Sequence, residues 1–529
     1  MKTTNKRITA AAAALLICTG ILGTGTPAAA YLRGDAVRDG TVSIEDAQIT
    51  LSAYADITAG KTNPLKTNDS RRADADGDGK ITAADAQLIL LYYTANTVAQ
   101  MPTAWRSLMP KPMQPGISDT GKKLTIGCYT NDDLSIMVEQ FTEQHPEYKD
   151  QVEYVKVGDF ASDASDRLAS LLDSGADIDL YVMEAEYLRN YINDADYSAP
   201  LSELGFTDQD FAACYPYTLS LGKDREGVLK AAAWQVHPGG YVYRSDLAEQ
   251  YFGVKTPAEM QEYVKDWDKF RDTAKQIQGK SDGKTAMLAT VSGILEAWKQ
   301  YPVGVKRSAD NQLTVDNDLK QVADVMRSFY VNGYTTTEYQ WTDGWYGVGQ
   351  NDEAFGYFFS SWCVGGKAML YYAEGGEDGT TYGKYNITEG PCPWFWGGYW
   401  MLLSPGCDNK TIAHDFIYDF VVNPETMKEF SARFKKAYGM PAFLNNMTLM
   451  SQQNEANPLL GGQSEFAVLH NNIKNMDIGK IYQDTDYALT RDALSYFESY
   501  YVRGTMSYDE TVQYIKDTFK GEYPEYTIK

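Results

Sequence analysis

The chain of 529 residues is acidic, with 71 Asp and Glu against 48 Lys and Arg and a formal net charge of −23. At roughly 100–200 residues per domain, this length predicts more than one domain. Its composition, 43% hydrophobic and 22% charged, is ordinary for globular proteins and excludes wholesale disorder. The acid excess argues against nucleic acid or an anionic membrane as partner, because both require clustered Lys and Arg.

The first thirty residues have the pattern of a secretory signal peptide. A basic start at Lys2, Lys6 and Arg7 precedes a short apolar run, and small residues at 28–30 offer a cleavage point. Bulky residues precede Cys18, where lipid attachment normally requires a small one, so we do not expect a lipid anchor. The sequence therefore predicts a secreted, extracellular protein.

Five cysteines follow this leader, an odd number, so at least one thiol stays unpaired or pairs between chains. Cys392 and Cys407 are the nearest pair in sequence. The sequence leaves open whether these two form a disulfide or all five are buried thiols.

Residues 34–57 and 73–96 repeat one another at an offset of 39 positions (73 − 34), and each copy begins with a calcium-loop pattern. An EF-hand loop places oxygen ligands at positions 1, 3 and 5, Gly at position 6 and a carboxylate at position 12. The second copy predicts the ligands Asp74, Asp76, Asp78, Lys80 (through its carbonyl), Thr82 and Asp85. The first predicts Asp35, Asp39, Thr41, Ser43 and Asp46. We expect two calcium ions, with the first site weakened because Val37 replaces an oxygen ligand.

Apolar residues spaced by three and four positions predict one helix after each loop. The duplicated loop–helix unit, Asp at position 12 and the shared Asp-Ala-Gln at 46–48 and 85–87 resemble a type I dockerin over about 31–98. The resemblance implies a small all-α calcium-binding module that binds a cohesin domain of a scaffoldin. Its partner-selecting positions would be Ile44, Glu45, Ala83 and Ala84. A free-standing calcium sensor is the alternative, although sensors have a helix on both sides of each loop.

Residues 101–120 are rich in proline and predict a stiff linker between a dockerin at 31–100 and a larger region at 121–529. Apolar segments at 124–128, 152–157 and 178–183 predict strands that alternate with helices, which is typical of βαβ units and a parallel sheet. The region exceeds one comfortable core, so we expect two lobes.

Several segments of this region, in order, resemble extracellular solute-binding proteins of the sugar-binding type from ABC transporters. They are 141–147, 177–182, 199–201, 233–246, 366–369, 400–404, 414–420 and 438–441. Within that family, 233–246 matches the crossing between lobes and 366–369 the strand by which the chain returns. The resemblance implies an α/β, two-lobed periplasmic-binding-protein-like fold that closes over one ligand and performs no catalysis.

Ligands of open α/β sheets bind beyond the carboxyl ends of the strands, and carbohydrate-specific relatives hold sugars with aromatic rings, carboxylates and amides. On these grounds the candidate ligand-binding residues are Tyr129, Asn131, Asp132, Glu184, Glu186, Tyr187, Trp234, Gln235, His237, Tyr372, Glu374, Trp394, Trp396 and Tyr399. Trp341, Trp345 and Tyr346 form a further aromatic group that the resemblance does not place. For any single ring, packing in a core is the competing interpretation.

We therefore expect a secreted binding protein that captures oligosaccharides and is attached to a scaffoldin, with an ABC importer permease as a further partner. A retention module without a transporter is an alternative, as is binding of peptides or other polar solutes. A dockerin-bearing glycoside hydrolase is the enzymatic alternative, which would require two carboxylates across a scissile bond. The nucleophile, zinc and phosphate-loop motifs of common enzymes are absent from the sequence.

Overall fold

The computed structural model describes residues 34–529 apart from 40, 76–79, 101–122, 130, 131, 160, 299–303, 309–311, 316, 477, 479–484 and 525. The predicted signal peptide, the proline-rich linker, the calcium candidates Asp76 and Asp78 and the ligand candidate Asn131 lie outside the described residues, as does the side chain of Asp132. In the part that is described, no helix has the length and apolarity needed to cross a membrane.

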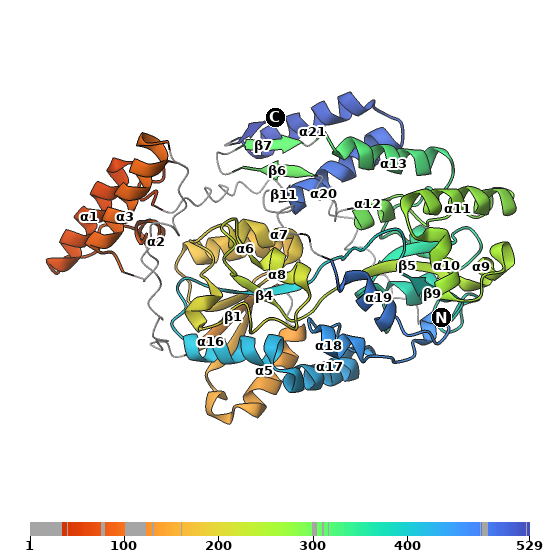
Figure 1. The fold of residues 1–529 in the computed structure, drawn as a ribbon, viewed down its shortest axis with the longest axis horizontal. Coiled ribbons are helices and arrows are strands. Elements are labelled where there is room, and N and C mark those ends of the chain that lie inside the picture. The colour runs from red at the N-terminus through yellow and green to blue at the C-terminus, as the bar shows by residue number, and fades with distance from the viewer. Residues whose placement is uncertain are drawn as a thin grey trace, which may run out of the picture.

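The N-terminal module contains the helices α1 (Ile44–Thr58), α2 (Thr67–Ala73) and α3 (Ala83–Tyr93), followed by a π-helical turn over Thr94–Val98. Helices α1 and α3 pack side by side (Figure 1). Ser43 and Thr82 cap them, and each forms a capping box with the Asp three residues later. One helix follows each loop, as predicted. The short α2, which precedes the second loop, was not expected.

The small core of this module leaves much apolar surface uncovered. It consists of Val42, Ala47, Ala75, Leu88 and Ile89. Outside it, four large apolar side chains of α1 and α3 are exposed by 44–49%: Ile44, Leu51, Leu90 and Leu91. Such a concentration of exposed apolar side chains is typical of a protein-binding surface.

A five-stranded sheet forms the first lobe, in the order β2-β1-β3-β10-β4. Its strands are β1 (Leu124–Cys128), β2 (Val152–Lys156), β3 (Leu180–Glu184), β4 (Ala231–Ala233) and β10 (Tyr399–Leu403). β1 pairs in parallel with β2 and β3, as predicted. The expectation of a wholly parallel sheet is wrong at β10, which runs antiparallel to both of its neighbours. The reason is that β10 enters the sheet from the other lobe.

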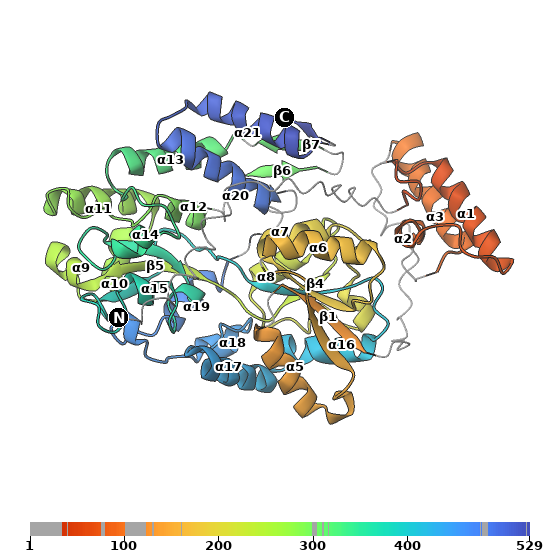
Figure 2. The same ribbon diagram turned by 180° about the vertical axis from the view of Figure 1, so that it is seen from behind.

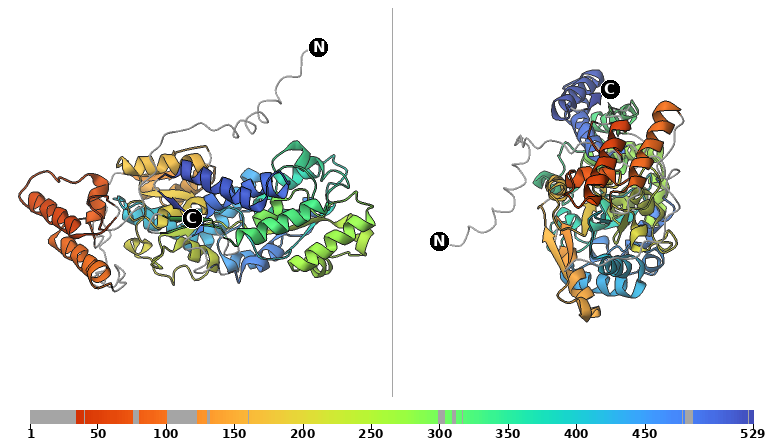
Figure 3. Two further views of the ribbon diagram at one scale, coloured as in Figure 1. Left: turned by 90° about the horizontal axis from the view of Figure 1, so that it is seen from above. Right: turned by 90° about the vertical axis from the view of Figure 1, so that its left-hand side faces the viewer.

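Two smaller sheets lie in the second lobe (Figure 2). One has the order β8-β5-β9, with the strands β5 (Gly239–Arg244), β8 (Gly356–Ser360) and β9 (Tyr385–Thr388). The other has the order β11-β6-β7-β12, with β6 (Val305–Arg307), β7 (Gln312–Val315), β11 (Thr485–Asp486) and β12 (Thr527–Ile528). Figure 3 shows the N-terminal helices at one end of the elongated molecule.

The remaining helices cover these sheets. Those around the first lobe are α5 (Asp132–Gln144), α6 (Ala161–Asp173), α7 (Ala185–Ile192), α8 (Pro216–Gly222), α16 (Lys410–Ile417), α17 (Pro424–Tyr438) and α18 (Met447–Ser451). The others are α9 (Ser245–Phe252), α10 (Pro257–Val264), α11 (Trp267–Lys280), α12 (Ser292–Trp298), α13 (Leu319–Val331), α14 (Asp343–Gly347), α15 (Met369–Ala373), α19 (Phe466–Ile473), α20 (Tyr487–Tyr496) and α21 (Tyr508–Glu522).

The chain crosses between the lobes from β4 to β5 and returns from β9 to β10. The predicted crossing at 233–246 is therefore confirmed. The prediction that 366–369 is the returning strand is wrong. There the chain turns at Gly366, whose φ is +57°, and Met369 begins the helix α15.

All five cysteines in the described part of the chain are buried, and none of them forms a disulfide there. Cys392 and Cys407 do not form the disulfide that the sequence left open. The two lobes are held together by their packed cores.

Candidate functional site

Tyr399 is surrounded by three aromatic side chains at one edge of the first sheet. Its ring centroid lies 5.8 Å from that of Tyr129, 5.5 Å from that of Trp234 and 5.7 Å from that of His237. Tyr129 follows β1 and Trp234 follows β4. Because β10 is antiparallel to its neighbours, its first residue, Tyr399, lies at this same carboxyl edge. We call these four residues the Tyr399 cluster.

A carboxylate lies beside the Tyr399 cluster. Glu184, at the end of β3, pairs in register with Tyr399. A Cβ on Gly397 would lie 3.3 Å from Glu184 Oε1 and 3.6 Å from the His237 ring. Burial, together with the charge of Glu184 and the Tyr399 hydroxyl, raises the pKa of Tyr129. The Tyr399 cluster and Glu184 therefore place neutral hydroxyl groups beside a carboxylate, and all of these groups can form hydrogen bonds with a polar ligand.

His237 is a neutral member of the cluster. Burial lowers its pKa to about 4, so the imidazole carries no charge at pH 7. Its Nδ1 lies 3.3 Å from the Ser361 hydroxyl, and its carbonyl accepts a hydrogen bond from the Trp396 N–H at 2.9 Å. His237 thus connects the Tyr399 cluster to the segment that carries Trp396.

A second aromatic group, the tryptophan cluster, consists of Trp341, Trp345, Trp362 and Trp396. The Trp396 ring lies 4.9 Å from Trp362 and 5.5 Å from Trp341. The Trp362 indole N–H donates to the Trp396 carbonyl at 3.0 Å. Trp345 is buried beneath Trp341, with ring centroids 5.6 Å apart.

Trp341 is the exposed member of this group. Its side chain is 48% exposed, and its φ of +71° lies in the left-handed region that non-glycine residues rarely adopt. Such conformations cost about 1–3 kcal/mol and concentrate at functional sites. Here the strained backbone presents an indole that solvent can reach.

The two clusters meet on one segment of chain. Trp396 and Tyr399 are separated only by Gly397 and Gly398, whose φ values are +82° and +115°. Trp396 packs against the hydrophobic cores of both lobes. Rings contributed by both lobes therefore gather where the returning chain crosses from one lobe to the other.

The other predicted ligand residues lie in different surroundings. Gln235 is buried and donates to Asp133 Oδ2 at 3.0 Å. Glu186 forms an ion pair with Arg491 at 2.9 Å, and Tyr187 also interacts with Arg491. Tyr372 is 52% exposed on α15, and its ring lies 5.9 Å from Tyr346 next to the tryptophan cluster.

Four predicted ligand residues are almost fully buried: Trp234, Gln235, Glu374 and Trp394. Glu374 accepts a hydrogen bond from the Gly383 N–H at 3.0 Å, within the loop that follows α15. Trp394 packs in the second core, where its ring lies against Gly239 and Phe358. Neither Glu374 nor Trp394 has surface for a ligand in this conformation, because each fills the interior of its own lobe.

Trp362 is the site residue that the sequence analysis missed. It lies in the turn after β8, just before the segment that was interpreted as the returning strand. Its only local signal is an aromatic residue directly after a buried strand. Its neighbours Trp341 and Trp396 are remote in sequence.

The calcium loops are closed by their position-12 carboxylates. Asp85 accepts from the N–H groups of Ala75 and Thr82 at 2.8 and 2.7 Å, and Asp46 is held in the same way by Val37 and Ser43. The described candidates of the second loop, Asp74, Lys80, Thr82 and Asp85, supply the hard oxygens that calcium prefers. The first loop differs because Arg72 lies beside Asp35.

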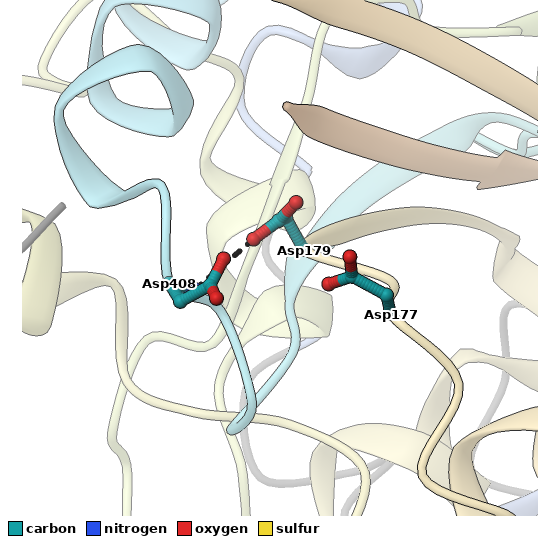
Figure 4. A group of neighbouring side chains, drawn as sticks. All are labelled: Asp177, Asp179 and Asp408. Atoms are coloured by element: carbon teal, nitrogen blue, oxygen red, sulfur yellow. Dashed lines mark hydrogen bonds between the residues drawn. The ribbon is translucent and has the colours of Figure 1, made fainter. Parts of the chain in front are cut away.

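A trio of carboxylates, Asp177, Asp179 and Asp408, has oxygens within 4.8 Å of one another (Figure 4). Buried Asp179 accepts from the backbone N–H groups of Thr125 and Asp408 at 2.8 and 3.1 Å. These bonds join β1 to the segment before α16. We therefore assign Asp179 a structural role.

Two α/β lobes that meet at paired aromatic clusters define a two-lobed binding protein. Residues 136–460 match the family described as bacterial extracellular solute-binding protein, and residues 33–92 match the type I dockerin domain. The first match spans 325 residues (460 − 136 + 1) of 529, and the chain belongs to the bacterial extracellular solute-binding protein family. It is a binding protein rather than an enzyme, and it carries a dockerin.

Solved structures have the same fold. An extracellular solute-binding protein family 1 structure has a TM-score of 0.63 at 17% identity and covers 75% of this chain and 98% of its own. The sugar-binding protein MalE from Xanthomonas citri has a TM-score of 0.57 at 15% identity, and the match covers 75% of this chain and 96% of MalE. The lacto-N-biose-binding protein of an ABC transporter from Bifidobacterium longum has a TM-score of 0.52 at 16% identity, and the match covers 76% of this chain and 98% of that protein. A search of curated proteins found no match.

Proposed function

We propose that this protein is secreted, captures oligosaccharides between its two lobes and is attached through its calcium-dependent dockerin to a cohesin domain of a scaffoldin. The captured sugar passes to an ABC importer. The observation that carries the ligand class is the meeting of the Tyr399 and tryptophan clusters where the chain crosses between the lobes.

The chemistry of these clusters suits a carbohydrate. Aromatic faces pack against the apolar faces of sugar rings, and the hydroxyl groups of Tyr129 and Tyr399 and the carboxylate of Glu184 are hydrogen-bonding partners for sugar hydroxyls. A neutral His237 adds a polar group without adding charge. Neighbours of the same fold bind lacto-N-biose and β-1,6-galactobiose, which supports this ligand class.

The dockerin surface supports the attachment. The four proposed partner-selecting residues, Ile44, Glu45, Ala83 and Ala84, are all exposed at the starts of α1 and α3. Together with the exposed apolar side chains of the same helices, they offer a surface for a cohesin. Attachment to a scaffoldin would keep the binding protein at the cell surface without a lipid anchor on Cys18.

Isothermal titration calorimetry of the full chain against panels of oligosaccharides and peptides tests the ligand class. We expect at least one oligosaccharide to bind and Trp341→Ala to weaken it about tenfold, a loss of roughly 1.4 kcal/mol. Tyr418→Ala, which removes a comparably exposed ring from the first lobe, is the matched control. Binding of peptides with no response to any sugar would overturn the proposal.

Pull-down of the full chain by immobilised cohesin domains, with calcium or with a chelator, tests the attachment. Retention that requires calcium is the expected result. In cells, deletion of residues 31–100 should release the protein from the surface, and a truncated protein that stays there would contradict scaffoldin attachment.

A further inference from the structure

Arg72 lies at the contact between the dockerin and the first lobe. It belongs to α2, which Figures 1 and 2 place between the α1–α3 pair and the first lobe. Its Nε lies 3.1 Å from Asp196 Oδ2 in the first lobe, and its Nη1 lies 3.6 Å from Asp35 Oδ2 in the first calcium loop. All three side chains are 2–4% exposed. One buried guanidinium therefore joins the two parts of the chain.

On the dockerin side, Arg72 faces a predicted calcium ligand. Asp35 is position 1 of the first loop, and its Oδ1 accepts a hydrogen bond from the Asp39 N–H at 3.0 Å. Its other oxygen, Oδ2, is turned toward Arg72. The backbone of Arg72 also supports this loop, because its carbonyl accepts from the Gly34 N–H at 2.9 Å.

A guanidinium in this position conflicts with calcium. Two cations beside one buried carboxylate repel each other, and burial weakens the screening by solvent. The loop also lacks an oxygen ligand at position 3, where Val37 lies. Calcium would have to displace Arg72, which would leave the buried Asp196 without this counter-charge, and such a loss is expensive. The residues of the first loop thus do not fit calcium.

On the side of the lobe, Asp196 belongs to an acidic group that requires positive charge. Its N–H donates to Asp194 Oδ1 at 2.8 Å. The neighbouring Lys230 and Asp224 lie 3.5 Å apart and are also buried. Burial and the charge of Asp196 raise the pKa of Asp194, whereas Arg72 and Lys230 act in the opposite direction. Arg72 is therefore part of the charge balance of the lobe as well as of the loop.

We propose that the Arg72 guanidinium takes the place of calcium in the first loop and fixes the dockerin against the first lobe through Asp196. The chain then holds one tightly bound calcium ion, in the second loop. The module is a docked domain with a defined orientation, which leaves the starts of α1 and α3 available to a cohesin. This arrangement is independent of the nature of the sugar.

Calcium titration of the calcium-depleted full chain by calorimetry tests the replacement. We expect one tight ion in the unmodified chain and a second in Arg72→Met, with affinity at the first loop at least about tenfold higher. Arg38→Met is the control, because it removes a positive charge of the same loop that pairs with Asp69 rather than with Asp35. This variant should still bind only one calcium ion tightly. Two equally tight ions in the unmodified chain would overturn the proposal, and that count requires no variant to fold.

Val37→Asp tests the rival explanation. If the missing ligand at position 3 alone keeps calcium out, this variant should bind two ions as tightly as the second loop binds one, and the role assigned to Arg72 would be wrong. If Arg72 fills the site, Val37→Asp should gain much less affinity than Arg72→Met.

Small-angle X-ray scattering of the full chain tests the fixed orientation. Asp196→Asn and Arg72→Met should each increase the radius of gyration and the maximum dimension, because the dockerin is released. Asp208→Asn, an exposed acid of the first lobe, is the charge control. Unchanged scattering in both interface variants would show that the contact does not hold the dockerin.

Discussion

Trp341 and Trp362 stack with their ring planes only 9° apart and their centroids separated by 6.2 Å. Trp396 stands across both, at 60° to Trp341 and 64° to Trp362. The three indoles therefore form an aromatic corner, of which Trp341 is the most accessible wall. A sugar ring that packs against this corner meets two surfaces at once.

The hydrogen bond between the Trp362 indole and the Trp396 carbonyl orients one wall of this corner. Trp362→Phe keeps a ring but removes the donor, and we expect a loss of about 1 kcal/mol in the free energy of unfolding. Urea denaturation measures this loss. Trp341→Phe, at the exposed position, is the control and should lose less. Equal losses would show that the hydrogen bond does not stabilise the segment.

Both the backbone conformation at residue 398 and the space beside it require glycine. The φ of Gly398 is +115°, and a Cβ there would lie 2.9 Å from the buried Trp400 ring. We expect Gly398→Ala to lower the free energy of unfolding by about 2–4 kcal/mol. Gly462→Ala, where φ is +90° and the Cβ would meet open space, should cost about 1 kcal/mol and isolates the conformational part. Similar losses for both variants would contradict a steric role for Trp400.

Glu374 gives stability a dependence on pH. Burial raises its pKa from 4.5 to about 8, so the folded protein holds this proton more tightly than the unfolded chain. The stabilisation that the folded state gains from protonated Glu374 is thus fully present below pH 4.5, and it is lost as the pH rises to about 8.

Glu374→Gln should remove this dependence and stabilise the protein at pH 8 by at least about 1 kcal/mol. Thermal or urea unfolding between pH 5 and pH 9 measures the effect. Glu377→Gln changes an exposed acid in the same loop and should leave the profile unaltered. If the stability of the wild type and of Glu374→Gln depended on pH in the same way between pH 5 and pH 8, the assignment to Glu374 would be refuted.

Removal of calcium should separate the two proposed activities of the chain, which are cohesin binding and sugar binding. Metal binding and folding are coupled in small modules, so chelation or Asp85→Ala should unfold the dockerin and abolish cohesin capture. Sugar affinity should stay within about twofold of that of the untreated protein, because the clusters lie in the lobes. Calorimetry with a chelator measures this, and a parallel loss of sugar binding would contradict the separation.

Much of the fold could be predicted because its signals are local. The segments predicted as strands at 124–128 and 152–157 became β1 and β2, and the apolar spacing after each loop became α1 and α3. The antiparallel entry of β10 could not be read in this way, since it depends on where the chain returns from the other lobe. The predicted strand at 366–369 is wrong for the same reason, because the return point of the chain is set by the folded lobes.

The site was predictable in part. Tyr129, Glu184, Trp234, His237 and Tyr399 do come together, because each lies at the end of a strand or at a crossing. The tryptophan cluster depends on contacts among residues 341, 362 and 396, which only the folded chain creates. Sequence position likewise does not show that Trp394 and Glu374 point into the interior.

The five cysteines in the described part of the chain are buried thiols rather than disulfides. Burial raises the pKa of Cys128, Cys214, Cys363 and Cys407 above the usual value for a thiol. Native thiols should therefore react slowly with alkylating dyes. A cysteine introduced on an exposed position of each lobe can then be labelled selectively, which offers a route to single-molecule measurement of lobe closure without rebuilding the protein.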